Sequence, residues 1–121
     1  IRGRDIRNVI VHDSARPFIT KKCIGNLMGC DDMFLYSQYY LKLVNGLAKG
    51  NKMVDRGKYV EICTPFICNY GLFCFIFDNY IDGKNRIVHE VMPILNIMGI
   101  KYNLILGNSK ELRKITYDYD V

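Results

Sequence analysis

Residues 8–18 (NVIVHDSARPF) place chemically useful side chains directly after a short apolar run. The run 9–11 has the composition of a buried strand, and the carboxylate of Asp13 and the guanidinium of Arg16 follow it closely. A carboxylate can bind Mg²⁺ while phosphates supply further ligands, and a guanidinium can donate two hydrogen bonds to a phosphate. The spacing fits equally well a strand-end turn in which Asp13 caps backbone amides and Arg16 is solvated. We expect His12 to orient this turn rather than to act as a base.

Thr64 and Pro65 form a second candidate anion site. Threonine at an N-cap followed by proline at the first helical position is typical of a helix start. The exposed N–H groups of such a terminus can bind phosphate, with help from the threonine hydroxyl. A helix cap with no ligand is the simpler interpretation, so the Thr64–Pro65 pair alone does not establish an anion site.

The elements that would position these side chains alternate between strand and helix. We expect a strand at 8–12, a helix capped by Thr20 that runs to about Gly29, a hairpin-like arm within 41–59, a helix from Thr64 that stops at 82–83, a short helix at 89–99, a strand at 101–107 and a short strand at 112–116. Residues 31–50 fit either type. This alternation predicts an α/β layer fold with a largely parallel sheet. Ligands bind such sheets at the carboxyl ends of the strands, which is where Asp13 lies.

Length and charge restrict the function classes. The 121 residues suffice for one domain with a core. The net charge of +5 comes without a run of consecutive basic residues, so small anionic substrates account for it better than a nucleic acid does.

The cysteines and the apolar segments give further limits. The five cysteines contain no CxxC pair and the two histidines lie far apart, which argues against a zinc site and for reduced thiols in a cytosolic protein. The most apolar window, residues 71–81, is too short to span a bilayer, so we expect no membrane partner.

Three motifs in order resemble one enzyme family. The segments VIVHDSARPF (9–18), VDRGKYVEICTP (54–65) and RKITYDYD (113–120) are similar to signatures of the cytidylyltransferases that make CDP-methylerythritol in bacteria and plastids and CDP-ribitol in animals. The resemblance implies a Rossmann-like nucleotidyltransferase fold and a homodimer joined by extended arms. It also implies that a polyol phosphate attacks the α-phosphorus of CTP and releases pyrophosphate, with Mg²⁺ as cofactor and Asp13 on the metal and nucleotide side.

The same resemblance assigns the remaining site residues. Ser14 and Arg16 would lie beside the polyol phosphate, and Thr64 and Lys114 would hold the acceptor phosphate. Arg56, on the arm, would reach the site of the partner subunit. Asp13, Arg16 and Lys114 are thus the expected catalytic residues.

The C-terminal segment GNSKELRKITYDYDV (107–121) favours one acceptor. Its Gly-x-x-x-x-Leu-x-Lys-x-Thr-Tyr-x-x-Asp pattern is closer to the animal ribitol-5-phosphate cytidylyltransferases. We therefore expect ribitol 5-phosphate as the acceptor, with 2-C-methyl-D-erythritol 4-phosphate as the alternative.

The family's Gly-rich CTP-binding loop has no counterpart before residue 8, and the chain begins with isoleucine. We therefore expect residues 1–121 to be the C-terminal part of one cytidylyltransferase domain, with a fold that is incomplete at its N-terminus and no activity on its own. The alternative is a divergent remnant that folds but does not catalyse.

Overall fold

The computed structural model describes residues 5–44, 46–80 and 91–116. Within them, a four-stranded sheet has the order β1 (Asn8–Val11), β5 (Val60–Asn69), β2 (Tyr36–Lys42) and β6 (Asn103–Leu106). β5 runs antiparallel to both β1 and β2, and β6 runs parallel to β2. The described sheet is therefore mixed, not largely parallel. The reason is the arm, which returns the chain from the end of β2 straight into β5 and so makes this pair antiparallel.

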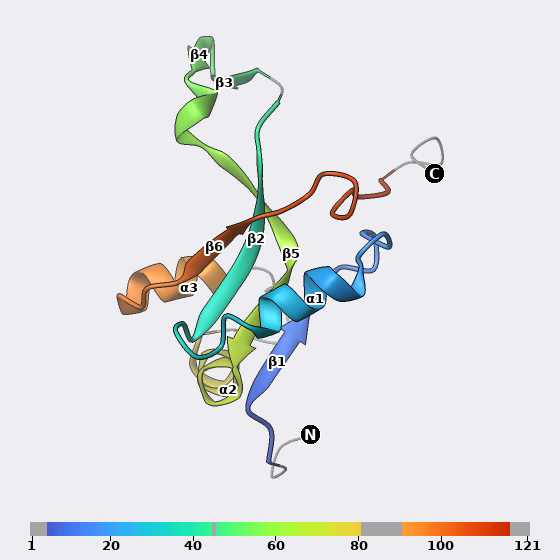
Figure 1. Cartoon of the computed structure of the whole chain (residues 1–121). Helices are drawn as coiled ribbons and strands as arrows, with labels where there is room; N and C mark the ends of the chain where they lie inside the picture. Colours follow the sequence, from blue (N-terminus) through green and yellow to red (C-terminus); the bar gives the residue numbers. More distant parts are fainter. Residues whose placement is uncertain (1–4, 45, 81–90, 117–121) are drawn as a thin grey trace.

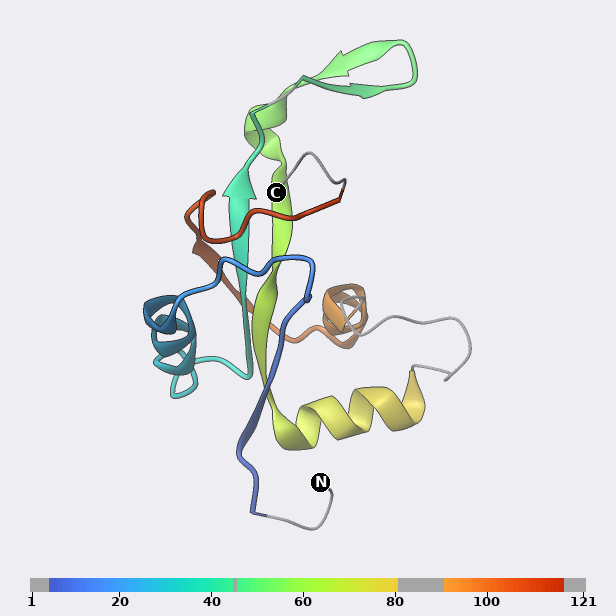
Figure 2. The ribbon, with the colours of Figure 1, turned by 90° about the vertical axis from the view of Figure 1, so that its right-hand side faces the viewer.

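Helices lie on both faces of the sheet (Figures 1 and 2). Figure 2 shows α1 (Lys21–Met28) on one side and α2 (Tyr70–Asn79) with α3 (Val91–Met98) on the other. Alternate residues of the strands supply a separate apolar cluster to each layer. On the α2–α3 side the buried members are Tyr36, Phe66, Cys68, Ile76, Val91, Ile94 and Leu95, and on the α1 side they are Cys23, Leu27, Tyr39, Cys63, Ile67 and Leu112. The predicted α/β architecture is confirmed.

Local signals set the ends of the helices. The Thr20 hydroxyl accepts a hydrogen bond from the Cys23 N–H at 3.2 Å, which confirms the predicted cap of α1. Pro93 lies in the first turn of α3, where its missing N–H costs nothing, and Gly99 follows the helix with a φ of +72°. No described helix has the length and apolarity needed to cross a bilayer.

The prediction that a helix begins at Thr64 is wrong. β5 continues through Thr64 and Pro65, which are joined by a cis peptide, and α2 begins only after Asn69, which caps it. The pairing of β2 with β5 shifts at this point, so that neither Thr64 nor Pro65 has a partner in β2. Proline has no N–H for a ladder hydrogen bond, and an irregularity of this kind is where a sheet tolerates it. The expected stop of this helix at residues 82–83 lies outside the described residues.

A hairpin projects from the sheet between β2 and β5 (Figure 1). β3 (Leu47–Lys49) and β4 (Lys52–Val54) pair antiparallel, and Gly50 supplies the left-handed turn residue with a φ of +62°. A short 3₁₀ helix, η1 (Arg56–Lys58), then leads into β5. The predicted hairpin within 41–59 is confirmed, and its role in a dimer stays a prediction.

The segment after β6 is irregular, so the short strand expected at 112–116 is wrong. It turns back because Gly107 and Leu112 pack tightly together. A Cβ on Gly107 would lie 2.2 Å from Leu112 Cδ1 and 3.2 Å from Tyr39 Cδ1. Leu112 itself is fully buried in the α1-side cluster. This packing directs residues 112–116 toward the end of β1.

Candidate functional site

The turn after β1 is fixed by its own hydrogen bonds. Asp13 Oδ1 accepts from the Ala15 N–H at 2.9 Å, and the Asp13 carbonyl accepts from the Arg16 N–H at 3.0 Å. The His12 ring donates from Nε2 to the Arg16 carbonyl at 2.6 Å. His12 therefore orients the turn, as expected from the sequence. The cap formed by Asp13, one of the two alternatives left open, is also present.

Thr64 contacts this turn from the neighbouring strand. Its hydroxyl oxygen accepts a hydrogen bond from the Asp13 N–H at 3.0 Å. Thr64 thus reaches the predicted site as a strand residue rather than as the cap of a helix. The predicted phosphate site at a helix N-terminus is therefore wrong, and the role of Thr64 in holding the acceptor phosphate stays a prediction.

The C-terminal segment covers the other side of the turn. Arg16 Nη1 donates to the Leu112 carbonyl at 2.6 Å, and the Ile115 N–H donates to the Ala15 carbonyl at 2.7 Å. The Arg16 side chain is buried, with 8% of the residue exposed, so the alternative in which it is solvated is wrong. Lys114 Nζ lies 3.7 Å from Asp13 Oδ2.

Asp13 carries a negative charge at neutral pH. The hydrogen bond from the Ala15 N–H lowers the pKa of this carboxyl, partial burial works in the opposite direction, and the positive charges of Lys114 and Arg16 lower it further. Asp13 and Lys114 both remain partly exposed, so their ion pair contributes little to stability. Its effect is to hold the Lys114 ammonium group beside the turn.

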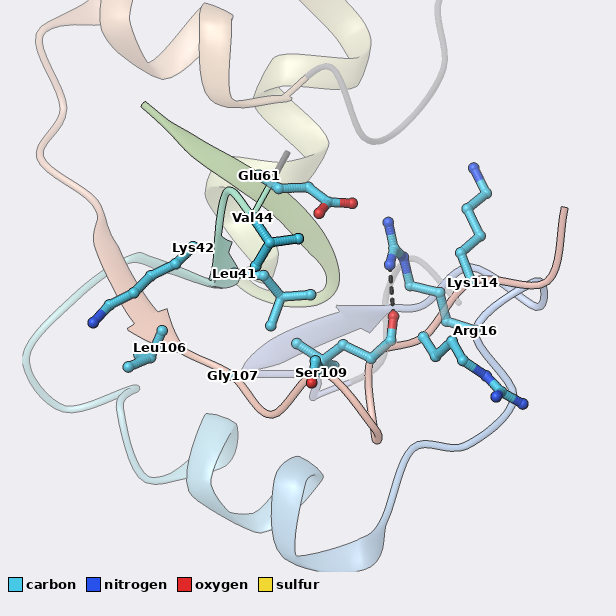
Figure 3. A pocket seen from close by; sticks show the side chains of 11 residues that line it. Arg16, Leu41, Lys42, Val44, Glu61, Leu106, Gly107, Ser109 and Lys114 are labelled. Atoms are coloured by element: carbon cyan, nitrogen blue, oxygen red, sulfur yellow. Dashed lines mark hydrogen bonds between the residues drawn. The ribbon is translucent and has the colours of Figure 1, made fainter. Parts of the chain in front are cut away.

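A pocket of about 520 Å³ opens beside Arg16 (Figure 3). Its cationic side chains come from β2, from the turn and from the C-terminal segment. Leucines from β2, from β6 and from the C-terminal segment supply apolar surface, and Glu61 of β5 supplies the carboxylate. The lining residues are Arg16, Leu41, Lys42, Val44, Glu61, Leu106, Gly107, Ser109, Leu112, Arg113 and Lys114. An excess of positive charge around a partly apolar pocket suits a small organic anion.

Two predicted residues lie apart from these contacts. Ser14 is exposed on the turn. Arg56 lies on η1 and donates from Nη1 to the Val44 carbonyl at 2.7 Å. It lines a separate pocket at the base of the arm, of about 580 Å³. In the described part of the chain, no contact joins Arg56 to Asp13 or Lys114.

The donor atoms limit what metal the site can take. Within the described ranges, no group of three or more histidine, cysteine, aspartate or glutamate side chains gathers as a metal site. Asp13 offers an ionised carboxylate whose Oδ2 lies 3.7 Å from Lys114 Nζ. Such a site fits Mg²⁺ that takes its other ligands from phosphates and water.

Sequence reasoning missed Lys42, Glu61 and Arg113 as pocket residues. Glu61 escaped because a helix starting at Thr64 left residues 60–63 unassigned. Because residues 60–69 form a strand, Glu61 and Cys63 lie on the same face of β5, and Glu61 on this face lines the pocket. Arg113 is further held by the ring of Phe18, 4.5 Å from its guanidinium carbon.

Comparison with known proteins identifies the fold. No protein-family model and no curated protein sequence matches the chain. Among solved structures, the bifunctional IspDF of Campylobacter jejuni is similar with a TM-score of 0.78 and 24% identity, over 98% of this chain and 30% of that one. The 2-C-methyl-D-erythritol 4-phosphate cytidylyltransferase of Thermus thermophilus gives 0.75 and 18%, over 96% and 59%. The 4-diphosphocytidyl-2C-methyl-D-erythritol synthase of Anaerococcus prevotii gives 0.77 and 16%, over 94% and 55%.

These likenesses confirm the Rossmann-like nucleotidyltransferase fold predicted from the motifs. The chain spans less than two thirds of the length of each of these structures.

Proposed function

We propose that the chain is the C-terminal part of a cytidylyltransferase that transfers CMP from CTP to a polyol phosphate and releases pyrophosphate. The observation that carries this proposal is that three separate motifs meet at the turn after β1, beside the pocket that Arg16 and Lys114 line. Asp13 and Arg16 come from the first motif, Thr64 from the second and Lys114 from the third, and hydrogen bonds or an ion pair connect them. The nucleotidyltransferase fold supports the same function.

In this proposal the pocket binds the acceptor phosphate. Arg16 and Lys114 neutralise its oxygens, and the hydrogen bonds that hold the turn keep both cations in place. The acceptor oxygen is already anionic, so it needs no general base. It forms a bond to the α-phosphorus of CTP while the bond to the bridging oxygen of the β-phosphate breaks, and that oxygen leaves with pyrophosphate. Alignment and charge neutralisation then supply the rate enhancement.

Asp13 has two tasks in this scheme. Its carboxylate holds Lys114 in the resting site, and it is the residue that would hold Mg²⁺. When bound, Mg²⁺ neutralises phosphate charge and orients the nucleotide. Because the Asp13 pKa is lowered, this carboxylate is ionised and ready to accept a cation at neutral pH.

Arg56 and the arm belong to the same proposal. We propose that the arm forms a homodimer and that Arg56 enters the site of the partner subunit. Exposed apolar side chains on the arm support this, with Val44 78% and Met53 75% exposed. The described cysteines are all free, and the three in the sheet and α1 that are buried suit the reducing cytosol, where we place the protein.

The acceptor is tested by pyrophosphate release. A protein that contains this chain is incubated with CTP, Mg²⁺ and either ribitol 5-phosphate or 2-C-methyl-D-erythritol 4-phosphate. The C-terminal motif leads us to propose ribitol 5-phosphate as the acceptor. The similar enzyme of Thermus thermophilus is instead named for 2-C-methyl-D-erythritol 4-phosphate. We expect release with ribitol 5-phosphate. Release only with the methylerythritol phosphate would correct the acceptor, and no release with either would favour the non-catalytic remnant.

A further inference from the structure

Glu61 stands out because it is an acid in a pocket that is otherwise suited to anions. It lies on β5 opposite Leu41 of β2, on the strand face that carries Cys63. Figure 3 shows its carboxylate pointing toward the guanidinium of Arg16. Both charges act on the thiol of Cys63, whose pKa is raised mainly by burial, lowered by Arg16 and raised by Glu61. Glu61 and Arg16 therefore face the same part of the pocket.

The Glu61 carboxylate has unused hydrogen-bonding capacity. In the described part of the chain, its side chain takes part in no hydrogen bond and no ion pair, whereas the carboxylate of Asp13 has both. An ionised carboxylate can only accept hydrogen bonds. A ligand group next to it must therefore be a donor, and a second phosphate at this position would be repelled.

The pocket thus offers three kinds of surface. Arg16 and Lys114 supply positive charge, the side chains of Leu41, Leu106 and Leu112 supply apolar contact, and Glu61 supplies acceptor oxygens. A molecule that combines a phosphate, a short carbon chain and several hydroxyl groups matches these three kinds of surface. The volume of about 520 Å³ is sufficient for such a molecule.

We propose that Glu61 accepts hydrogen bonds from the hydroxyl groups of the acceptor and thereby selects a polyhydroxylated phosphate over a bare one. This inference rests on the proposed function, because it assigns the acceptor to the same pocket. It makes Glu61 a specificity residue: a site built to bind hydroxyl groups rejects ligands that lack them, since the acceptor atom is then left unpaired.

The test compares two ligands on three proteins. Binding of ribitol 5-phosphate and of inorganic phosphate is measured by calorimetry on the protein that contains this chain, on Glu61→Gln and on the control Glu111→Gln. Glu111 offers the same chemical change on a residue that does not line the pocket, and glutamine can still accept its hydrogen bond from Thr20. Thermal unfolding checks that each variant is folded.

We expect Glu61→Gln to weaken binding of ribitol 5-phosphate but not binding of inorganic phosphate. Glu61→Gln removes the charge and one of the two acceptor oxygens, and should weaken ribitol 5-phosphate binding by about threefold to tenfold, because a hydrogen bond to an ionised acceptor is roughly twice as strong as one to a neutral acceptor. It should leave inorganic phosphate unchanged or bound up to about fivefold more tightly, because a nearby negative charge is removed. Glu111→Gln should change neither.

A loss of both ligands together would show that Glu61 is merely structural, and unchanged ribitol 5-phosphate binding would overturn the proposal. Equal affinity of the unmodified protein for the two ligands would overturn it as well. Pyrophosphate release is assayed in parallel. If Glu61→Gln weakens binding of ribitol 5-phosphate alone and no pyrophosphate is released, the role of Glu61 in recognition is retained and the proposed activity is refuted, so the two failures are distinguishable.

Discussion

The contact between Gly107 and Leu112 allows one substitution to be worked out in detail. A Cβ on Gly107 would lie 2.2 Å from Leu112 Cδ1, far inside van der Waals contact. The leucine cannot simply rotate away, because it is fully buried among Cys23, Leu27 and Tyr39. In Gly107→Ala the segment that carries Leu112 must therefore shift. Overpacking of this kind costs about 1–3 kcal/mol.

The shift would also reach the pocket. The Leu112 carbonyl accepts from Arg16 at 2.6 Å, and displacing it removes the contact that holds the guanidinium. We therefore expect Gly107→Ala to lower the free energy of unfolding in urea by about 1–3 kcal/mol. We also expect it to raise KM for the acceptor while KM for CTP stays unchanged. Gly25→Ala is the matched control, because nothing lies within 4 Å of its new Cβ. In the interior of α1 it should stabilise the protein by about 0.5–1 kcal/mol.

A double-mutant cycle tests whether the contact with Leu112 causes the destabilisation of Gly107→Ala. Leu112→Ala alone should cost about 2–5 kcal/mol. Combined with Gly107→Ala, it removes the atom that the new methyl group meets, so the double variant should be less destabilised than the sum of the two single variants. Strict additivity, or a Gly107→Ala protein as stable as the unmodified one, would refute the packing argument.

Three further predictions concern the turn. Lys114→Ala should raise KM for the acceptor about tenfold without changing the affinity for CTP. It should change the free energy of unfolding by less than about 1 kcal/mol, because the ion pair with Asp13 is partly exposed. A larger effect on CTP than on the acceptor would show that the role of Lys114 is misassigned. Asp13 has a lowered pKa when folded, so its stabilising effect is present above the unfolded pKa and is lost as the pH falls through the folded one. Asp13→Asn should therefore be less stable at pH 7 and show a flatter acid profile in unfolding experiments, and an unchanged profile would contradict this. Thr64→Val leaves the Asp13 N–H without its acceptor and should cost about 1–3 kcal/mol in urea unfolding, whereas Thr64→Ser should retain most of the stability.

The parts of the fold that could be predicted depend on short-range signals. The apolar run before His12 predicts β1, and Thr20 predicts the start of α1 because its hydroxyl caps a nearby N–H. The Thr64–Pro65 pair carries the same kind of signal, yet it lies within β5. Pairing of β5 with β1 and β2 outweighs the local preference, and that pairing involves strands distant in the sequence.

The residues of the candidate site could likewise be predicted only in part. The motifs led to Asp13, Arg16, Thr64 and Lys114, which the structure brings together. The burial of Arg16 was not predicted, because its acceptor at Leu112 is 96 residues away and is placed by the packing of Gly107. Glu61 was missed for a related reason: its place in the pocket follows from the register of β5, which the sequence does not show directly.

The central claim is that the acceptor binds between the turn after β1 and the C-terminal segment. The most direct measurement is a titration of the ¹⁵N-labelled protein with ribitol 5-phosphate, followed by backbone amide chemical shifts. We predict the largest changes at residues 13–16, at Thr64 and at residues 112–114. Changes concentrated instead at the pocket between α3 and β6, around Phe34 and Lys101, would contradict the claim.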